Sequence, residues 1–379
     1  LREESSLLLK EGEPGLMKSL LFEPLTTLRG SFTTLIYFVE DLIDNFFESD
    51  EEEAVFECRI TLRRMKKIAE ICERFGRFDD FTEEIFWLET ATAYTGEKYV
   101  RFVISPLDIA PMMREAVFEK HPTVIFTSAT LTVNGSFVYW KSRLGLSREA
   151  LERSFPSPFD YRNRVLLGIP TDAPLPSEAD FQSYASDFIR DVLEISEGRA
   201  LVLFTSYSML NATFVAVQPA LSSLGISVLR QGDEDRNRLL VRFREETASV
   251  LFATDSFWEG VDAPGEALEV LVLCRLPFRV PTEPIFRART EAVTAGGGNA
   301  FLELALPDTA IKLKQGFGRL MRRGGDYGIV LILDSRIVKR SYGEYLLRSL
   351  PETARSIKER KYLLEDIENF LVSARKSAG

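Results

Sequence analysis

The stretch PDTAIKLKQGFGRLMRRGGDYGIVLILD, residues 307–334, joins a helical pattern directly to a buried strand, which is the basic unit of an α/β fold. With Asp308 as an N-cap, apolar side chains recur at helical spacing, and Gly324 and Gly325 then end the predicted helix. These apolar positions are Leu313, Phe317 and Leu320. The apolar run 329–333 follows and predicts a strand that is buried on both faces.

The polar face of this predicted helix carries Gln315, Arg319 and Arg322, which fall at i, i+4 and i+7. Arginine offers fixed, forked donors that keep their charge, so an amide and two guanidinia on one face suit a polyphosphate. Gly316 and Gly318 interrupt the helix at a cost of about 1 kcal/mol each relative to Ala, which favours close approach of a ligand or a neighbouring backbone. An ordinary solvated basic helix is the alternative interpretation.

The composition is that of a globular protein with two or three cored domains. The chain has 379 residues, of which 45% are hydrophobic, and a formal net charge of −10. This charge argues against bulk coating of nucleic acid but allows a local basic track. The sequence contains no apolar run of about 18 residues and no export signal, so we expect a cytoplasmic protein without a membrane partner. Because it opens at Leu1 inside a helical pattern, we also expect a fragment of a longer protein.

Three cysteines and one histidine limit the metal and nucleophile chemistry. Cys58, Cys72 and Cys274 have no CxxC spacing, so we expect reduced thiols and no metal site in this chain. An ordinary iron–sulfur cluster requires four clustered thiolates, more than this sequence contains. His121 precedes a proline and a β-like run, which is typical of a loop, so a Ser-His-Asp hydrolase is not predicted.

The first part of the chain is predicted to be mainly helical. Residues 1–80 repeat apolar positions at helical spacing, and 85–88 with 99–104 predict a short strand pair that closes this module. A buried strand is then predicted over 123–126, and it ends in the hydroxyl-rich run TSATL at 127–131. Parallel sheets present such groups to ligands at the carboxyl ends of their strands, although a TSATL run also arises by chance.

Beyond the loop 156–158, β-like runs alternate with helical stretches. The predicted strands are 165–169, 200–204, 227–230, 250–253, 270–274 and 329–333, and the helices between them include 181–196, 209–224 and 236–246. This alternation predicts an α/β fold with one doubly wound, mostly parallel sheet that is covered by helices on both faces.

The loops after two of these strands carry unusual residues. The first contains Ser206 and Tyr207, and the second, TDSFWEGVDAPG, spans 254–265. Because parallel strands end at the same edge of a sheet, both loops should lie at the ligand-binding edge. Hydroxyl and backbone N–H groups there suit nucleic-acid phosphates, and Tyr207 or Trp258 suits base stacking, with a core aromatic as the alternative for Trp258.

Four motifs, taken in order, resemble motifs III to VI of the DinG/XPD helicases. They are TSATL at 127–131, LFTSY at 203–207, FATDSFWEGVDAPG at 252–265 and QGFGRLMR at 315–322. The similarity runs from about Trp87 to the end and is greatest to bacterial DinG-like proteins. It implies a RecA-like second motor domain at 151–379. The carboxyl-terminal edge of the first motor domain would lie at 105–150 and an Arch-like helical module at 1–104.

The resemblance implies an ATP-driven helicase that moves 5′ to 3′ on single-stranded DNA, with two RecA-like domains that close on ATP. Motif VI would place Gln315, Arg319 and Arg322 against the triphosphate, with one arginine as the finger that stabilises charge on the transferred phosphoryl group. Nucleotide contacts in motif V would come from Glu259, Gly260 and Asp262, although the two acids also suit contacts to an arginine or capping of the next turn. The residues implied on the DNA side are Ser128, Thr130, Ser206, Tyr207, Thr254 and Trp258.

Three elements of that family are absent from this sequence: the GxxxxGK[ST] loop, the DEAH-type box and the four-cysteine cluster loop. In the family they precede the Arch. We therefore expect ATP and Mg²⁺ to be bound mainly by an amino-terminal motor domain of the same protein, which would also hold any iron–sulfur cluster. The present chain should then be monomeric and unable to hydrolyse ATP alone. The competing hypothesis is a non-catalytic RecA-like module that binds DNA or protein, against which the shared face of Gln315, Arg319 and Arg322 weighs.

Overall fold

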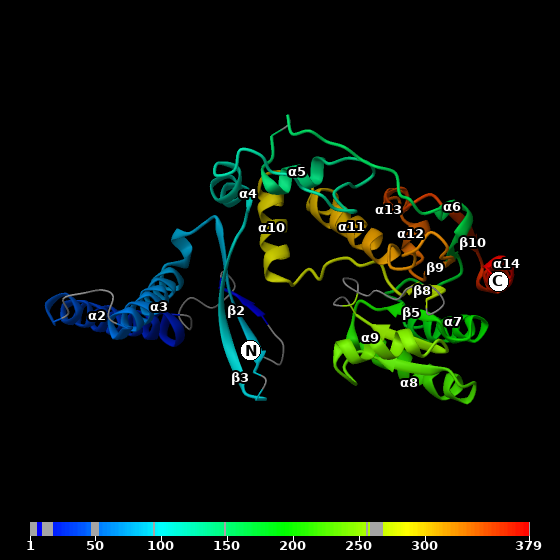
Figure 1. Cartoon of the computed structure of the whole chain (residues 1–379), viewed down its shortest axis with the longest axis horizontal. Coiled ribbons are helices and arrows are strands. Elements are labelled where there is room, and N and C mark those ends of the chain that lie inside the picture. The colour runs from blue at the N-terminus through cyan, green and yellow to red at the C-terminus, as the bar shows by residue number, and fades with distance from the viewer. Residues whose placement is uncertain are drawn as a thin grey trace. The chain divides into compact units, whose positions relative to one another are not determined.

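The computed structural model describes residues 6–9, 18–46, 53–93, 95–147, 149–254, 257 and 268–378. The chain divides into two compact units, whose elements are labelled in Figure 1. Unit 1 comprises Leu1–Met112 and Val280–Gly298, and unit 2 comprises Met113–Arg279 and Asn299–Gly379. No helix within the described ranges has the length and hydropathy of a membrane span.

Unit 1 combines a helical hairpin with a small antiparallel sheet. Helices α2 (Glu23–Phe46) and α3 (Glu53–Gly76) pack together through Ile36, Ile43, Val55 and Leu62. The sheet has the order β1-β2-β3, with β1 at Ser6–Leu8, β2 at Glu84–Thr92 and β3 at Lys98–Pro106. Helix α10 (Pro284–Ala295) packs against Trp87 of β2 through Ile285 and Ala288. The predicted strand pair is confirmed, and its register pairs Trp87 with Val103.

Seven parallel strands form the centre of unit 2, in the order β10-β4-β9-β8-β5-β7-β6. They are β4 (Val165–Pro170), β5 (Ala200–Leu203), β6 (Ser227–Arg230), β7 (Ser249–Ala253), β8 (Val270–Leu273), β9 (Gly328–Ile332) and β10 (Ala354–Lys358). The apolar runs predicted all of these strands except β10.

Helices cover both faces of this sheet (Figure 1). One face carries α7 (Phe181–Ser196), α8 (Tyr207–Ser223) and α14 (Arg360–Ala378), and the other carries α9 (Arg236–Glu245), α11 (Leu306–Phe317), α12 (Arg336–Lys339) and α13 (Gly343–Ser349). Because strand side chains alternate, Val202 enters the first core while Leu201 and Leu203 enter the second. The predicted α/β fold, a doubly wound RecA-like sheet, is confirmed.

Strand β10 lies at the edge of the sheet beside β4, and its composition explains why no pattern predicted it. Of its five residues only Ser356 is buried, and the others include Arg355 and Lys358. Short, charged edge strands protect a sheet from pairing with other chains. A strand of this kind has no apolar run for sequence analysis to detect.

Residues 113–164 contain short helices but no sheet strand. These are η4 (Arg114–Phe118), which continues α4 (Ala110–Met113), then α5 (Val138–Leu144) and α6 (Tyr161–Arg164). The predicted buried strand at 123–126 is wrong: no strand forms there and the Ile125 side chain is 84% exposed. A strand buried on both faces needs neighbours for its N–H and C=O groups. The expectation that this run lacks sheet partners within the chain is confirmed for the described residues.

Candidate functional site

Helix α11 begins before the residue that was expected to cap it. It starts at Leu306 with Pro307 in its first turn and continues a π-helical turn, η7 (Phe301–Ala305). The Asp308 carboxylate accepts hydrogen bonds from Arg279 Nε at 2.8 Å and from the Tyr139 hydroxyl. The prediction of Asp308 as N-cap is therefore wrong, because residues distant in sequence use its carboxylate. Burial and the Asp308 charge raise the pKa of Tyr139.

The helix also ends earlier than expected. It stops at Phe317, Gly318 forms the C-cap, and the Arg319 N–H donates to the Gly316 carbonyl at 3.0 Å. The following turn is held by the buried Asp326, which accepts the backbone N–H groups of Arg322 and Arg323 at 2.8 and 2.7 Å. The prediction that Gln315, Arg319 and Arg322 share one helical face is wrong, since only the first is helical.

The three side chains nevertheless line one groove, here called the arginine groove. It has a volume of about 1100 Å³. Its other walls include Ile125–Thr132, Leu151, Arg153–Phe159, Tyr161 and Ser349–Pro351. Motifs III and VI, far apart in the sequence, thus meet in one groove through Ser128, Thr130 and the three motif VI residues. The buried side chains of Leu313 and Phe317 fix α11 beside it, as their spacing predicted.

The motif III wall presents hydroxyl groups. Ser128 Oγ lies 3.3 Å from Thr130 Oγ1 and accepts the Thr130 backbone N–H at 3.2 Å. Such a turn holds both hydroxyls in place without a strand. The two predicted residues therefore lie in a loop wall of the groove and not at a strand end.

The arginine groove is positively charged. Among the described residues that line it, four are cationic and none is acidic; the cations are Arg153, Lys314, Arg319 and Arg322. Burial lowers the pKa of Lys314. Burial also raises the pKa of Tyr161, partly offset by a hydrogen bond with Ser157 and by the charge of Arg322. In a chain with a net charge of −10, this local excess of cations favours an anionic ligand.

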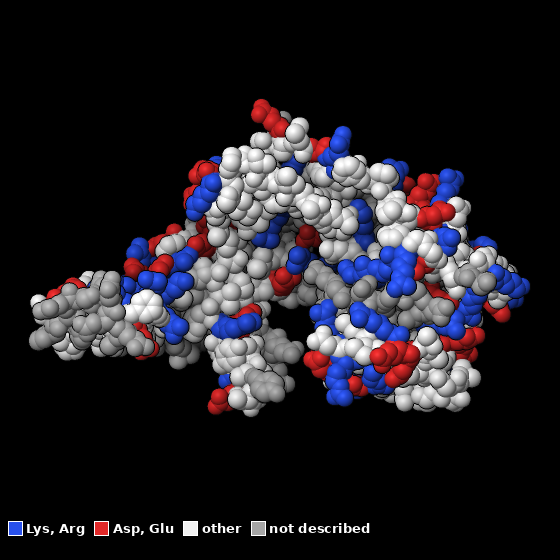
Figure 2. Space-filling model, viewed as in Figure 1, with Lys and Arg blue, Asp and Glu red and all other residues white. Residues whose placement is uncertain are grey.

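Surface charge differs between parts of unit 2. Figure 2 shows Lys and Arg side chains gathered over α11 and α12, whereas acidic and basic side chains are intermixed around α8 and α9. In α9 the intermixing includes the ion pairs of Arg242 with Glu234 and Glu246.

A second set of predicted residues lies beyond the carboxyl ends of β5 and β7. Ser206 is the N-cap of α8, and its side chain accepts the Met209 N–H at 3.3 Å. Tyr207, with 53% of its surface exposed, and the buried Thr254 are joined by the side chain of Gln231. We call Tyr207, Gln231 and Thr254 the strand-end network. The sequence prediction missed Gln231, although it follows β6 as directly as Thr254 follows β7.

The remaining predicted residues of motif V have no structural description. Trp258, Glu259, Gly260 and Asp262 lie outside the described residues. Of this loop, Phe257 is described and buried, with the Arg236 guanidinium 5.1 Å from its ring centroid. The roles of Trp258, Glu259, Gly260 and Asp262 stay predictions.

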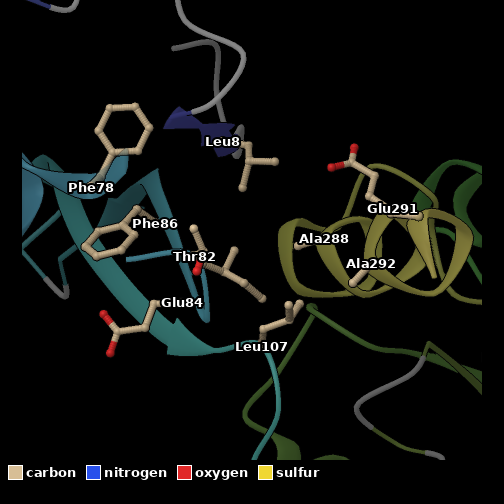
Figure 3. Close-up of a pocket in the computed structure, with 11 residues that line it drawn as sticks. Leu8, Phe78, Thr82, Glu84, Phe86, Leu107, Ala288, Glu291 and Ala292 are labelled. Atoms are coloured by element: carbon tan, nitrogen blue, oxygen red, sulfur yellow. The ribbon is translucent and has the colours of Figure 1, made fainter. Parts of the chain in front are cut away.

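A smaller cavity lies in unit 1, between the sheet and α10 (Figure 3). Its volume is about 270 Å³ and its walls are mainly apolar, including Leu8, Phe86, Leu107 and Ala288. It contains none of the predicted site residues. Within the described part of the chain, no three His, Cys, Asp or Glu side chains gather into a group that could hold a metal ion.

Known proteins are similar in sequence to most of this chain. The family described as Helicase C-terminal domain matches residues 189–353. The ATP-dependent DNA helicase YoaA of Haemophilus influenzae is 40% identical over 253 residues, which are 67% of this chain and 39% of that protein. The 3′-5′ exonuclease DinG of Bacillus subtilis is 33% identical over 325 residues, or 83% of this chain and 34% of that protein. The chain spans between a third and two fifths of the length of these curated relatives.

Solved structures share the fold. One described as apo XPD matches with a TM-score of 0.52 at 16% identity, over 82% of this chain and 61% of that chain. A second, described as XPD helicase, matches with a TM-score of 0.50 at 14% identity, over 89% of this chain and 65% of that chain. At such identities the likeness is one of fold.

Proposed function

The chain belongs to the DinG/XPD family of helicases, and from this premise we propose that it is the carboxyl-terminal part of an ATP-dependent DNA helicase. The whole protein would couple ATP hydrolysis to 5′ to 3′ movement on single-stranded DNA. In this proposal residues 151–379 form the second motor domain, 105–150 the edge of the first, and 1–104 an Arch-like module.

The observation that carries the proposal is the arginine groove. Gln315, Arg319 and Arg322 line it together with Ser128 and Thr130, and its described lining has four cations and no carboxylate. A groove with two guanidinia and an amide fits the oxygens of a triphosphate, because guanidinium forks match phosphate geometry.

The groove residues would act by binding and charge stabilisation. ATP supplies the phosphoanhydride bond whose cleavage drives movement. Arg319 or Arg322 would stabilise the negative charge that develops on the transferred group, and Gln315 would orient a phosphate oxygen. Ser128 and Thr130 share the groove, so the proposal gives them the coupling of nucleotide state to the DNA track.

Ser206, Tyr207 and Thr254 would contact DNA. Ser206, Tyr207 and Thr254 follow β5 and β7 at one edge of the sheet, where hydroxyl groups suit backbone phosphates and the exposed Tyr207 ring suits a base. In the same proposal Trp258 would stack on a base, and Glu259, Gly260 and Asp262 would sense the nucleotide.

The proposal requires the first, amino-terminal motor domain in addition to this chain. The sequence lacks a GxxxxGK[ST] loop and a DEAH-type box, and the described residues lack a group of metal ligands. Mg²⁺ and most of the nucleotide would therefore be bound by the amino-terminal motor domain of the same protein, and the present chain would not hydrolyse ATP by itself.

The test uses the intact protein and this chain side by side. ATP turnover is measured with and without single-stranded DNA, and strand displacement is measured on duplexes with a 5′ or a 3′ tail. We expect DNA-stimulated turnover and displacement from the 5′ tail by the intact protein, and no turnover by the present chain. Displacement only from the 3′ tail contradicts the direction. DNA binding without any turnover in the intact protein overturns the motor and favours a binding module.

A further inference from the structure

Gln231 joins the ends of three neighbouring strands. Its backbone N–H donates to the Phe252 carbonyl at 2.9 Å, which extends the pairing of β6 with β7 by one residue. Its half-buried side chain reaches Thr254 at the end of β7 and Tyr207 at the start of α8, the helix that follows β5. The side chain is therefore anchored by the sheet.

The orientation of the Gln231 amide follows from its partners. Gln231 Oε1 accepts the Thr254 backbone N–H at 2.7 Å and the Thr254 hydroxyl at 3.1 Å. A backbone N–H can only donate, so the oxygen must face Thr254 and the amide nitrogen must face Tyr207. Gln231 Nε2 then donates to the Tyr207 hydroxyl oxygen.

This orientation determines what the Tyr207 hydroxyl can offer to a ligand. Its oxygen already accepts a hydrogen bond from Gln231 Nε2, so its own hydrogen points elsewhere. Among the described residues the Tyr207 hydroxyl makes no other hydrogen bond, and 53% of the residue's surface is exposed. The hydroxyl is thereby set as a donor toward solvent, and a donor suits a phosphate oxygen, which can only accept.

We propose that Gln231 is a positioning residue that presets Tyr207 as a hydrogen-bond donor to a backbone phosphate of single-stranded DNA. The proposal rests on the DNA-binding function proposed above and adds to it a residue and a mechanism. The same amide holds the backbone of Thr254, the residue at which the motif V loop leaves the sheet. The Gln231 side chain thus connects Tyr207, the proposed DNA contact, with Thr254, where the motif V loop begins.

The first test is Gln231→Glu in the intact protein. Glutamate has the same shape and keeps acceptors for both Thr254 donors, but it cannot donate to Tyr207 and instead accepts a hydrogen bond from the Tyr207 hydroxyl. We expect the Kd for fluorescently labelled oligothymidine, measured by anisotropy, to rise about tenfold, as for loss of one charge-assisted hydrogen bond. The kcat of ATP turnover at saturating DNA should stay unchanged while the DNA concentration for half-maximal turnover rises.

A double-mutant cycle separates this effect from simple charge repulsion. Tyr207→Phe removes the donor and should also weaken binding about tenfold. In that background Gln231→Glu should have no further effect once added salt screens the new charge. Gln218→Glu, an exposed glutamine on α8, is the matched charge control and should leave the Kd unchanged at the same salt.

Equal weakening by Gln231→Glu in both backgrounds overturns the positioning role, while leaving DNA binding itself intact. If Gln231→Glu lowers the folded fraction, Tyr207→Phe decides alone, because it retains both bonds to Thr254; an unchanged Kd in that variant overturns the proposal. Absence of DNA binding by the wild-type protein contradicts the proposed function instead.

Discussion

The seven strands of the sheet begin at one edge, the amino edge, and end at the opposite one, the carboxyl edge. Polar side chains at these two edges have different surroundings. At the amino edge, Glu269 directly precedes β8 and is 2% exposed. It accepts hydrogen bonds from Arg199 at 3.2 Å, Arg375 at 2.7 Å and the Tyr327 hydroxyl at 3.0 Å. Two guanidinium groups and a tyrosine thus bind one buried carboxylate, and these contacts connect the starts of β5, β8 and β9 with α14.

Elsewhere in unit 2, the arginines of motif VI line a groove of about 1100 Å³ whose described walls contain no carboxylate. At the carboxyl edge itself, the strand-end network leaves Tyr207 half exposed. The comparison teaches that arginine content does not identify a site. The surroundings do: a buried carboxylate makes an arginine structural, whereas a groove lined by hydroxyls and cations favours an anionic ligand.

The largest expected effect is at the groove. Arg319→Ala or Arg322→Ala in the intact protein should lower DNA-stimulated ATP turnover about 10³-fold, because each removes charge from the transition state. Arg323→Ala is the matched control, since Arg323 is the exposed neighbour and does not line the groove. Turnover at the wild-type rate in both groove variants, measured at an equal folded fraction, removes the assigned role.

A substitution at the amino edge should lower the stability of the fold but not the rate of ATP turnover. Glu269→Ala leaves two guanidinia without their shared carboxylate, and we expect the free energy of unfolding to fall by about 2–3 kcal/mol. This is below the cost at a fully buried pair, because both arginine side chains are about a quarter exposed. Urea denaturation measures the loss. A fall in turnover per folded molecule would contradict the division between the two edges.

A smaller effect is expected at the neutral member of motif VI. Gln315→Ala removes one amide from the arginine groove but no charge, so ATP turnover should fall about tenfold, as for one hydrogen bond to a charged group. Urea denaturation should show the wild-type midpoint. A loss as large as that of Arg319→Ala would mean that Gln315 does more than orient an oxygen.

The smallest effect concerns pH at the amino edge. Burial and the Glu269 charge raise the pKa of Tyr327 to about 12. A raised pKa means that the neutral tyrosine stabilises the fold below the unfolded pKa of about 10 and that this contribution is lost as pH rises toward 12. Below pH 10, Tyr327→Phe should therefore cost about 1 kcal/mol in the free energy of unfolding. Urea curves measured between pH 9 and 12 should converge with the wild type, and a constant difference would contradict this account.

Sequence reasoning worked where a property is local. Apolar runs predicted six strands of the sheet, and helical spacing placed α7 at its observed bounds, 181–196. It failed for β10, an edge strand of mostly exposed residues, and for 123–126, an apolar run without a sheet neighbour among the described residues. Burial on both faces is a property of the neighbours as well as of the strand.

The sequence by itself determined that the chain carries an α/β sheet and that Leu313 and Phe317 face its core. These conclusions depend on spacing along the chain, which the sequence contains. Only the tertiary structure decided that α11 ends at Phe317, that Ser128 and Thr130 share the arginine groove, and that Gln231 sets the Tyr207 hydroxyl. The spacing of apolar and charged residues does not contain these contacts. The Asp326 carboxylate holds the turn after α11, and folding brings the Thr254 N–H within hydrogen-bonding distance of Gln231, 23 residues away.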